Sequence, residues 1–462
     1  MTATRVDRSR LPEPGAARPF AFPSIEKSEL ASGLRVWSVR HAAVPLVSFM
    51  LLVRSGSSSD PDGKEGLAAI AADMLDEGSG DRSAIGMHEA LARIGAQFDT
   101  DIGADAALVS ITTLAKRADR GLQLLADIVA RPSLSEGDFA RVRQLRLHRL
   151  TQLRDVPGAV ADRTFMRLLY GSHPYGHTPT GTEQSVATLT VDDVRRFHAE
   201  RIRPDAATLI AVGDCDHATV ERMAAQAFAD WSRRDDLDAT AAAAGRSLAT
   251  PSSGTRLVVV SRPGAPQSEL RIGHVAVARN TPDYHALVAA NMVLGGQFVS
   301  RINLNLREDK GLTYGARTSF DFRRLAGPFS LQVSVQTVAT ARAIEESIGE
   351  IAAIRGPRPI TSDELSLGIA ALTRGYARNF ETAEQVARAA TQIALYDLPD
   401  DYFVQFVPRI ESVTPAEVTR ASAEHLHPEQ LLTLVVGDLD VIGKDLEQLG
   451  LGQPVVLSTE AL

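Results

Sequence analysis

Residues 189–216 read LTVDDVRRFHAERIRPDAATLIAVGDCD, and residues 413–440 read VTPAEVTRASAEHLHPEQLLTLVVGDLD. The two stretches align without a gap at an offset of 224 residues, and ten of their 28 positions are identical. Each stretch reads as a helix, a loop with Pro204 or Pro428, and an apolar strand that ends in Val-Gly-Asp. Because the offset is close to half of the 462 residues, the chain is predicted to be α+β, with two homologous tandem domains, each a mixed β-sheet packed with helices.

The repeat also sets the predicted domain boundaries. The first domain is placed at residues 24–233 and the second at residues 255–462. Between them, residues 234–254 change from Asp-rich to Ala-rich to Thr-Pro-Ser-Ser-Gly without a periodic pattern, which is typical of a linker. Residues 1–23 carry Arg, Pro and Gly but no continuous apolar run, so they are predicted to be a flexible N-terminal arm.

Composition argues against several classes of function. The net charge of -8 argues against a general affinity for nucleic acid or for an anionic membrane. The single cysteine, Cys215, allows neither an internal disulfide nor a thiolate metal cluster. No apolar run reaches transmembrane length, and no secretory signal is recognisable. The expected compartment is the cytoplasm, with the periplasm as the alternative if a leader is missing from this chain.

A second stretch, Leu306-Arg-Glu-Asp-Lys-Gly-Leu-Thr-Tyr-Gly315, supplies a candidate site. It reads as the end of a helix, then Gly311 where a left-handed cap is typical, then a strand from Leu312 onward. Arg307 and Tyr314 are thereby predicted to lie on either side of one turn.

The chemistry of this pair suits half of a hydrolytic site. A guanidinium offers five donors and a phenol one, which together can hold a peptide carbonyl and stabilise charge that develops on its oxygen. Neither group can hydrolyse a peptide bond. The alternative interpretation is structural, with Arg307 as a solvated helix-end charge and Tyr314 as an ordinary strand residue.

Taken together, the motifs resemble the insulinase/pitrilysin family of zinc peptidases, the inverted zincins that include the mitochondrial processing peptidase. The resemblance covers roughly residues 24 to 455 and implies a processing-peptidase-like fold. It rests on the two tandem domains and on three further pieces in a fixed order: Gly66-Leu-Ala, His173-Pro-Tyr-Gly176, and Leu294-Gly-Gly-Gln-Phe-Val-Ser-Arg301 ahead of residues 306–314.

The resemblance also shows what the chain lacks. Active members carry His-x-x-Glu-His on a first-domain helix, where the two His bind zinc and the Glu is the general base on the metal-bound water. The first His position matches Ala69, the Glu matches Ala72, and the second His matches Asp73. The family's distal Glu falls near His148 or Arg149. The chain is therefore expected to bind no metal and to be inactive alone. A self-sufficient peptidase with Asp73 and His148 as ligands is disfavoured, because catalytic zinc normally takes three protein ligands.

The second-domain pair does match the family pattern. In the family, an Arg and a Tyr with this separation help to bind substrate and to stabilise the tetrahedral intermediate, and they correspond to Arg307 and Tyr314. Some bacterial members are hetero-oligomers in which one subunit supplies the zinc motif and the other supplies the Arg/Tyr motif. The resemblance thus implies a homologous zinc-bearing partner, in a heterodimer or larger assembly, and an unfolded peptide as substrate. The alternative is a structural or peptide-binding scaffold subunit, as in the family's core subunits of the mitochondrial respiratory cytochrome complex.

Overall fold

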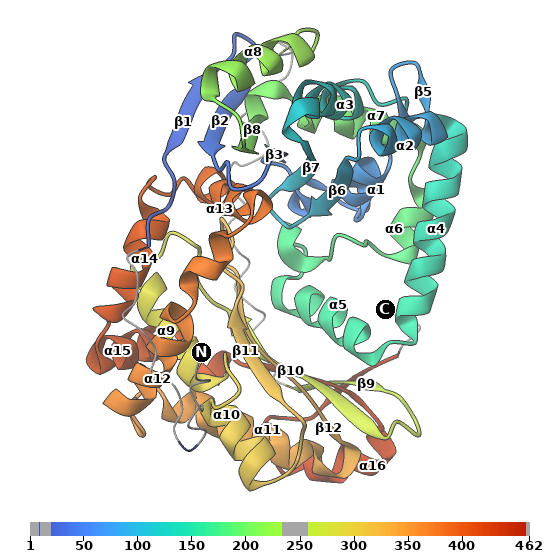
Figure 1. The fold of residues 1–462 in the computed structure, drawn as a ribbon. Helices are drawn as coiled ribbons and strands as arrows, with labels where there is room; N and C mark the ends of the chain where they lie inside the picture. Colours follow the sequence, from blue (N-terminus) through green and yellow to red (C-terminus); the bar gives the residue numbers. More distant parts are fainter. Residues whose placement is uncertain (1–8, 10–19, 233–256, 459–462) are drawn as a thin grey trace.

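The computed structural model describes residue 9, residues 20–232 and residues 257–458, and Figure 1 shows two domains, each built on a six-stranded sheet. The strands of the first sheet are β1 (Ile25–Glu29), β2 (Arg35–Arg40), β3 (Leu46–Val53), β6 (Gln97–Ile102), β7 (Ala107–Leu114) and β8 (Ala207–Gly213). Those of the second sheet are β9 (Leu257–Ser261), β10 (Gln267–Val275), β11 (Ala316–Phe320), β12 (Pro328–Gln336), β13 (Leu432–Gly437) and β14 (Val455–Leu457).

The two sheets share one topology. Their strand orders are β1-β2-β8-β3-β7-β6 and β14-β9-β13-β10-β12-β11. Shifting β2, β8, β3 and β7 by the repeat offset of 224 residues places them on β9, β13, β10 and β12. The outer edges differ, because β1 runs antiparallel to β2 whereas β14 runs parallel to β9. The predicted α+β fold of two homologous domains is confirmed, and the predicted linker at 234–254 lies outside the described residues.

Both faces of the first sheet are covered, which explains why its central strands are almost continuously apolar. All residues of β8 are buried, and so are all but the first of β3. Successive side chains of β3 point to opposite faces, so that Phe49 and Leu51 belong to one core while Met50 and Leu52 belong to another. The core around Phe49 is closed by three helices of the same domain: α2 (Ala84–Arg93), α3 (Ala118–Ala130) and α8 (His217–Ala227).

The other face of each sheet is closed by a helix from the opposite half of the chain (Figure 1). Helix α13 (Ala383–Tyr396) buries Ile393 in the core around Met50 of the first sheet. Helix α5 (Pro157–Tyr170) buries Phe165 against the second sheet. Shifting α5 by 224 residues gives 381–394, so the two helices are repeat equivalents that have exchanged sheets. This exchange interlocks the domains.

The remaining helices complete the two domains, with an additional small core in the first. Across the described ranges, no helix combines the length and the apolar content that crossing a membrane requires. The small first-domain core is formed by α1 (Leu67–Asp73), α4 (Glu136–Arg154), α6 (Glu183–Thr188) and α7 (Val191–Arg201). The second domain adds α9 (Tyr284–Leu294), α11 (Thr340–Ala353), α12 (Ser362–Thr373), α14 (Tyr402–Glu411), α15 (Pro415–His425) and α16 (Leu439–Glu447).

The end of the predicted N-terminal arm is packed rather than loose. Phe22 is buried, and its ring centroid lies 5.5 Å from that of Phe380 and 5.2 Å from that of Phe403. Phe20 contacts the ring of Tyr376 at 5.2 Å. These aromatic side chains order the residues just before β1 because they bury apolar area against the second half of the chain. Phe20 and Phe22, at the end of the predicted arm, therefore pack against the second half of the chain.

The exchanged helices lead to a stability prediction. Ile393 on α13 is 1% exposed in the core that joins the two halves. We expect Ile393→Ala to lower the free energy of unfolding by about 2–5 kcal/mol, because it leaves a cavity in that core. Urea denaturation measures this change.

The matched control is Ile85→Ala, the same substitution at a side chain that is 74% exposed. Its effect should stay within about 0.5 kcal/mol. Equal effects of the two substitutions would show that α13 does not hold the halves together.

Candidate functional site

The predicted Arg/Tyr stretch forms a helix end followed by a turn. Helix α10 (Arg301–Asn303) continues into the π-helical segment η5 (Leu304–Asp309). The amide of Lys310 donates to the carbonyl of Asn305 at 3.2 Å, and this five-residue spacing widens the last turn. Gly311 then adopts a φ of +62°, the left-handed conformation predicted for the cap. Such π-helical segments are rare and frequently occur at functional sites.

Arg307 is held by its own domain rather than solvated. Its guanidinium lies over the ring of Phe298, 3.3 Å from the ring centroid. Its Nη2 donates to the Phe298 carbonyl at 3.2 Å, and its Nε donates to the Glu308 carboxylate at 2.8 Å. As a result, only 13% of the side chain is exposed.

Tyr314, by contrast, is 95% exposed. It lies in the turn before β11, which begins at Ala316 rather than at Leu312, so the predicted strand start was wrong. Within the described part of the chain, no hydrogen bond or ring contact joins Tyr314 to Arg307. The structure therefore places both residues on one surface segment without bringing their side chains together.

Side-chain hydrogen bonds fix the turn and explain the later start of the strand. The Thr313 hydroxyl accepts from the Gly315 amide at 3.1 Å and donates to the Ser334 carbonyl at 2.7 Å. Asn303, which is buried, accepts from the Ala316 amide at 2.8 Å and donates to the Ala316 carbonyl at 2.9 Å. Asn303 thus joins the helix before Arg307 to the strand after Tyr314, a role that no sequence motif indicated.

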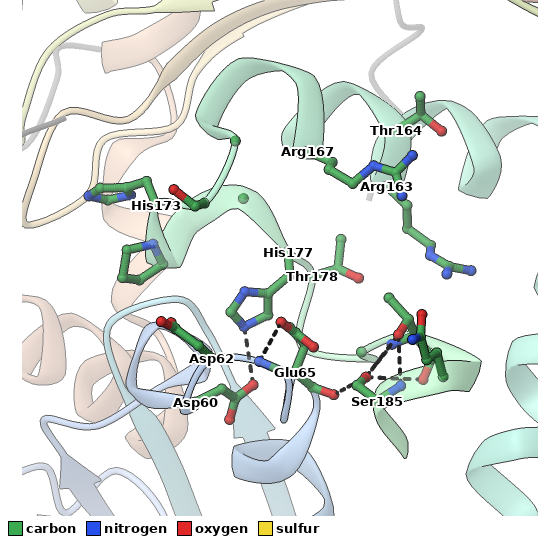
Figure 2. A pocket seen from close by; sticks show the side chains of 18 of the residues that line it. Asp60, Asp62, Glu65, Arg163, Thr164, Arg167, His173, His177, Thr178 and Ser185 are labelled. Carbon is green, nitrogen blue, oxygen red and sulfur yellow. Dashed lines mark hydrogen bonds and ion pairs between the residues drawn. The ribbon is translucent and has the colours of Figure 1, made fainter. Parts of the chain in front are cut away.

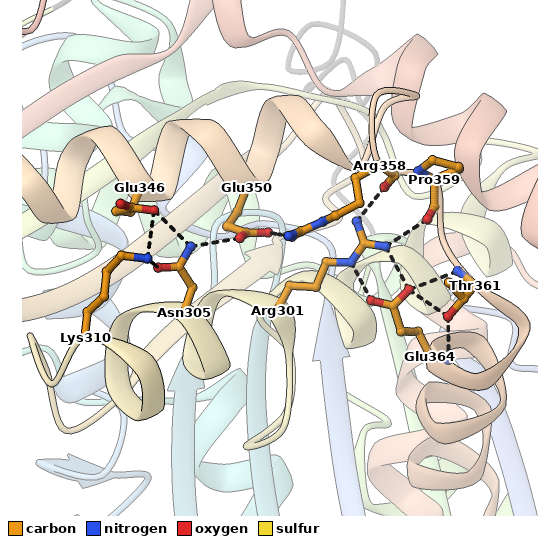
Figure 3. A network of polar contacts seen from close by, with 9 residues as sticks. All are labelled: Arg301, Asn305, Lys310, Glu346, Glu350, Arg358, Pro359, Thr361 and Glu364. Carbon is orange, nitrogen blue, oxygen red and sulfur yellow. Dashed lines mark hydrogen bonds and ion pairs between the residues drawn. The ribbon is translucent and has the colours of Figure 1, made fainter.

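The helix that precedes Arg307 is anchored by a buried guanidinium (Figure 3). Arg301 Nε and Nη2 form a bidentate pair with Glu364, at 2.7 and 2.8 Å. Its other donors reach the carbonyls of Arg358 and Pro359, at 2.7 and 3.0 Å. The Arg301 hydrogen bonds lower the pKa of Glu364 to about 2, and this carboxylate also accepts from the Thr361 amide that begins α12.

The η5 segment itself is tied to α11 by a second part of this network. Asn305 donates to Glu346 at 3.0 Å and to Glu350 at 2.9 Å. Lys310 forms an ion pair with Glu346 at 3.2 Å. Polar contacts at both ends therefore fix the backbone that carries Arg307 (Figure 3).

The three positions that the resemblance matches to the zinc motif lie on α1. Ala69 and Ala72 are buried in packing contacts and offer no ligand atom. Asp73 ends the helix, and its carboxylate pairs with Arg146 of α4. An ion pair thus joins the two helices on which the resemblance places the family's zinc ligands.

The residues present do not fit a zinc ion. His148 is exposed on α4 and bonds to Gln144 at 2.8 Å, and Arg149 is exposed and cationic. Among the described residues, the one group of three potential ligands is Asp283, Glu424 and His425, which lies in the second domain. Its Asp283 carboxylate already pairs with Arg420 and accepts from His425 at 2.8 Å.

Two family descriptions match the chain in tandem. The description "Insulinase (Peptidase family M16)" matches residues 35–182, and "Peptidase M16 inactive domain" matches residues 188–372. An uncharacterized zinc protease of Mycobacterium tuberculosis is 24% identical over 436 residues, which cover 92% of this chain and 96% of that protein. The zinc protease PqqE of Helicobacter pylori is 24% identical over 299 residues, covering 63% of this chain and 65% of that protein.

Solved structures show the same fold. The peptidase M16 inactive domain from Pseudomonas fluorescens superimposes with a TM-score of 0.82 and 24% identity, covering 90% of this chain and 98% of that one. A protease from Helicobacter pylori superimposes with a TM-score of 0.82 and 20% identity, covering 90% and 99%. Both superpositions therefore extend over most of this chain and nearly all of the other.

The Arg301–Glu364 pair predicts an acid dependence of stability. Because the pKa of Glu364 falls from 4.5 to about 2 on folding, its ionised form stabilises the folded chain above pH 4.5. This contribution is lost as the pH falls from 4.5 toward about 2. We therefore expect the difference in unfolding free energy between wild type and Glu364→Gln to be largest above pH 4.5 and to shrink below it.

Urea unfolding at a series of pH values measures this difference. The control is Asp363→Asn, an adjacent exposed carboxylate on the same helix turn. A Glu364→Gln difference that stayed constant between pH 5 and pH 3 would contradict the assignment of Glu364 as the ionised partner of Arg301.

Proposed function

Because the chain belongs to the insulinase family, peptidase family M16, we propose that it is the non-zinc-binding subunit of a heteromeric metallopeptidase. A homologous partner with His-x-x-Glu-His would supply zinc and the general base. This chain would supply Arg307 and Tyr314, which bind the scissile carbonyl region of a peptide and the charge that develops on its oxygen. On this proposal the chain is inactive alone.

The observation that carries the proposal is the exposure of Tyr314 on a rigidly held turn. A tyrosine is a large apolar group with one polar tip, and it is usually at least half buried. Here it is 95% exposed, while the turn beneath it is fixed by Thr313 and Asn303. A rigid backbone that presents one phenol to its surroundings is the arrangement expected of a donor that acts on another molecule.

The first domain supports the need for a partner. On α1, Ala69, Ala72 and Asp73 occupy the positions that the resemblance matches to the first His, the Glu and the second His of the zinc motif, and Asp73 pairs with Arg146. A guanidinium at this position repels a divalent cation.

One observation favours the second candidate function, a structural or peptide-binding scaffold subunit. Arg307 is already engaged by the Phe298 ring and carbonyl and by Glu308. In that state part of its hydrogen-bonding capacity is used within the chain. For the catalytic role, docking of the partner or the substrate must release the guanidinium from at least one of these contacts.

The catalytic role predicts a specific loss of turnover. We expect Tyr314→Phe to lower the turnover of the reconstituted complex by about 10²–10³-fold, the usual cost of removing one oxyanion donor. The unfolding free energy should not change, since the side chain is exposed. Single-turnover peptide cleavage and urea denaturation test the two parts.

Tyr396→Phe is the matched control, because it also removes one tyrosine hydroxyl. That hydroxyl donates a 3.2 Å hydrogen bond to the Phe322 carbonyl and does not belong to the turn that carries Tyr314. It should reduce stability without a comparable loss of turnover. Unchanged turnover in Tyr314→Phe would contradict the catalytic role and favour a structural or peptide-binding scaffold subunit.

The partner itself is testable. Affinity purification of the tagged chain from its native cells should recover a near-stoichiometric homologue of similar size that carries His-x-x-Glu-His, identified by mass spectrometry. Recovery of the chain alone, or only with unrelated proteins, would contradict the proposed heteromer.

A further inference from the structure

The motif His173-Pro-Tyr-Gly176, which follows α5, holds one tyrosine side chain in a fixed direction (Figure 2). Pro174–Gly176 form the 3₁₀ segment η3, and the Nδ1 atom of His173 accepts from the Tyr175 amide at 3.1 Å. The Gly176 amide donates to the His173 carbonyl at 2.7 Å. A Cβ atom at position 176 would clash with the carbonyl oxygen of Gly171, so this close turn requires glycine. The backbone beneath Tyr175 is therefore rigid.

Tyr175 reaches from the first domain to the second together with Asp105. Its hydroxyl donates to the Asp105 carboxylate and accepts from the Leu325 amide at 3.2 Å. The other oxygen of Asp105 accepts from the Arg324 amide at 2.8 Å. Burial and the neighbouring carboxylate raise the pKa of Tyr175, so the hydroxyl stays protonated and can donate. Two first-domain side chains thus bind two successive backbone amides of the second domain.

These amides belong to the hairpin of residues 321–327, which connects β11 to β12. Two more tyrosine hydroxyls bind the same hairpin through its carbonyl groups. Tyr170, at the end of α5, donates to Ala326 at 2.9 Å, and Tyr396 of α13 donates to Phe322 at 3.2 Å. Because the contacts are made to the backbone, they fix the path of the hairpin rather than the positions of its side chains.

The first-domain side of this contact is itself held firmly. Asp105 lies in the tight turn between β6 and β7, where the Gly103 amide donates to the Ala106 carbonyl at 2.9 Å. The Ser57 amide donates to the Gly103 carbonyl at 3.0 Å, which ties this turn to the segment that follows β3. The hairpin is therefore bound to a rigid part of the first domain.

The hairpin is continuous with the strand that follows the Tyr314 turn. Strand β11 is five residues long, and Asn303 holds its first residue, Ala316. Its other end leads directly into residues 321–327. The contact with Tyr175 therefore fixes the far end of the strand whose near end adjoins Tyr314.

We propose that Tyr175 and Asp105 form a latch that positions the Tyr314 turn relative to the first domain. The consequence for catalysis rests on the proposed function, in which Tyr314 must meet a peptide carbonyl at the partner's zinc. Placement matters there, because a displacement of about 1 Å can cost about 10²-fold in rate. Tyr175 is 2% exposed, so it touches no substrate and is a positioning residue.

Limited trypsin digestion of the isolated full chain tests the latch without a partner. Cleavage after Arg323 or Arg324 requires the hairpin to leave the first domain. Tyr175→Phe keeps the ring over which the Arg323 guanidinium lies, 4.7 Å from the centroid, but it deprives the Leu325 amide of its acceptor. We expect cleavage at these two sites, measured by mass spectrometry, to be about tenfold faster or more, because proteolysis follows the population of the open form.

Tyr376→Phe is the matched control, because it removes a buried hydroxyl that donates to the Phe403 carbonyl at 3.2 Å, outside the hairpin. It should leave hairpin cleavage unchanged, whereas Asp105→Ala should accelerate it as Tyr175→Phe does. Cleavage after Arg117, on an exposed 3₁₀ turn of the first domain, reports general destabilisation. Unchanged hairpin cleavage in Tyr175→Phe, or equal acceleration after Arg117, would overturn the latch.

A double-mutant cycle in the reconstituted complex tests the positioning role. Tyr175→Phe should lower turnover by about tenfold or more, with little further effect in a Tyr314→Phe background, because it acts through Tyr314. Additive losses, or unchanged turnover in Tyr175→Phe when Tyr314→Phe is impaired, would overturn the positioning role alone. Unchanged turnover in Tyr314→Phe would refute the catalytic role and the positioning role together, and the trypsin result would still decide the latch.

Discussion

The exchange of α5 and α13 between the two sheets is the constraint on which the rest of the molecule depends. A sheet whose strands are apolar on both faces must be covered on both, and each domain covers only one face with its own helices. Met50 and Leu52 of β3 would face water without α13, just as Val258 and Leu434 of the second sheet would without α5. The domains therefore cannot separate without exposing two apolar cores. This constraint fixes the orientation of one domain relative to the other.

The exchange also shapes a pocket of about 450 Å³ that lies between α5, the start of α6 and the loop 60–65 (Figure 2). Because α5 leaves its own sheet, it runs beside α4 and the 60–65 loop with one apolar side on the second domain and with Arg163 and Arg167 on another side. A helix packed in the usual way on its own sheet would not present these residues across from Glu65. Thus one packing arrangement both joins the domains and leaves a pocket between first-domain elements.

The architecture was predictable from the sequence because an internal repeat implies two copies of the same domain. The Val-Gly-Asp endings of β8 and β13 and the constant offset imply two copies of one unit, whatever the details of each strand. The exchange of α5 and α13 was not predictable in the same way. Periodicity shows that a helix has an apolar face, but it does not show which of two homologous sheets that face will meet.

The candidate site was predictable in part for similar reasons. The spacing of Arg307 and Tyr314 about a glycine cap was visible, and the structure has the cap at Gly311. Residues 312–315 were predicted as the start of the strand, but they form a turn. There the Thr313 side chain hydrogen-bonds the backbone of Gly315 and Ser334, and strand pairing begins only at Ala316. Asn303 was missed because a buried amide that joins a helix to a strand has no sequence signature. The pocket was missed because it combines segments that are distant in the sequence.

The state of Arg307 sets the energetic condition for any role in catalysis. A cation–π contact at a partly exposed site contributes about 0.5–1 kcal/mol, and a surface ion pair such as that with Glu308 contributes a similar amount. These contacts are weak enough for Arg307 to replace them with contacts to a ligand. A hydrogen bond from the same guanidinium to an oxyanion in a closed, water-poor cavity is stronger, because the local dielectric is lower. Arg307 would then leave Phe298 only once a partner has closed the cavity around the peptide. On the proposed function, a subunit whose Arg307 is engaged by Phe298 and Glu308 in isolation would be inert alone and would become competent on assembly.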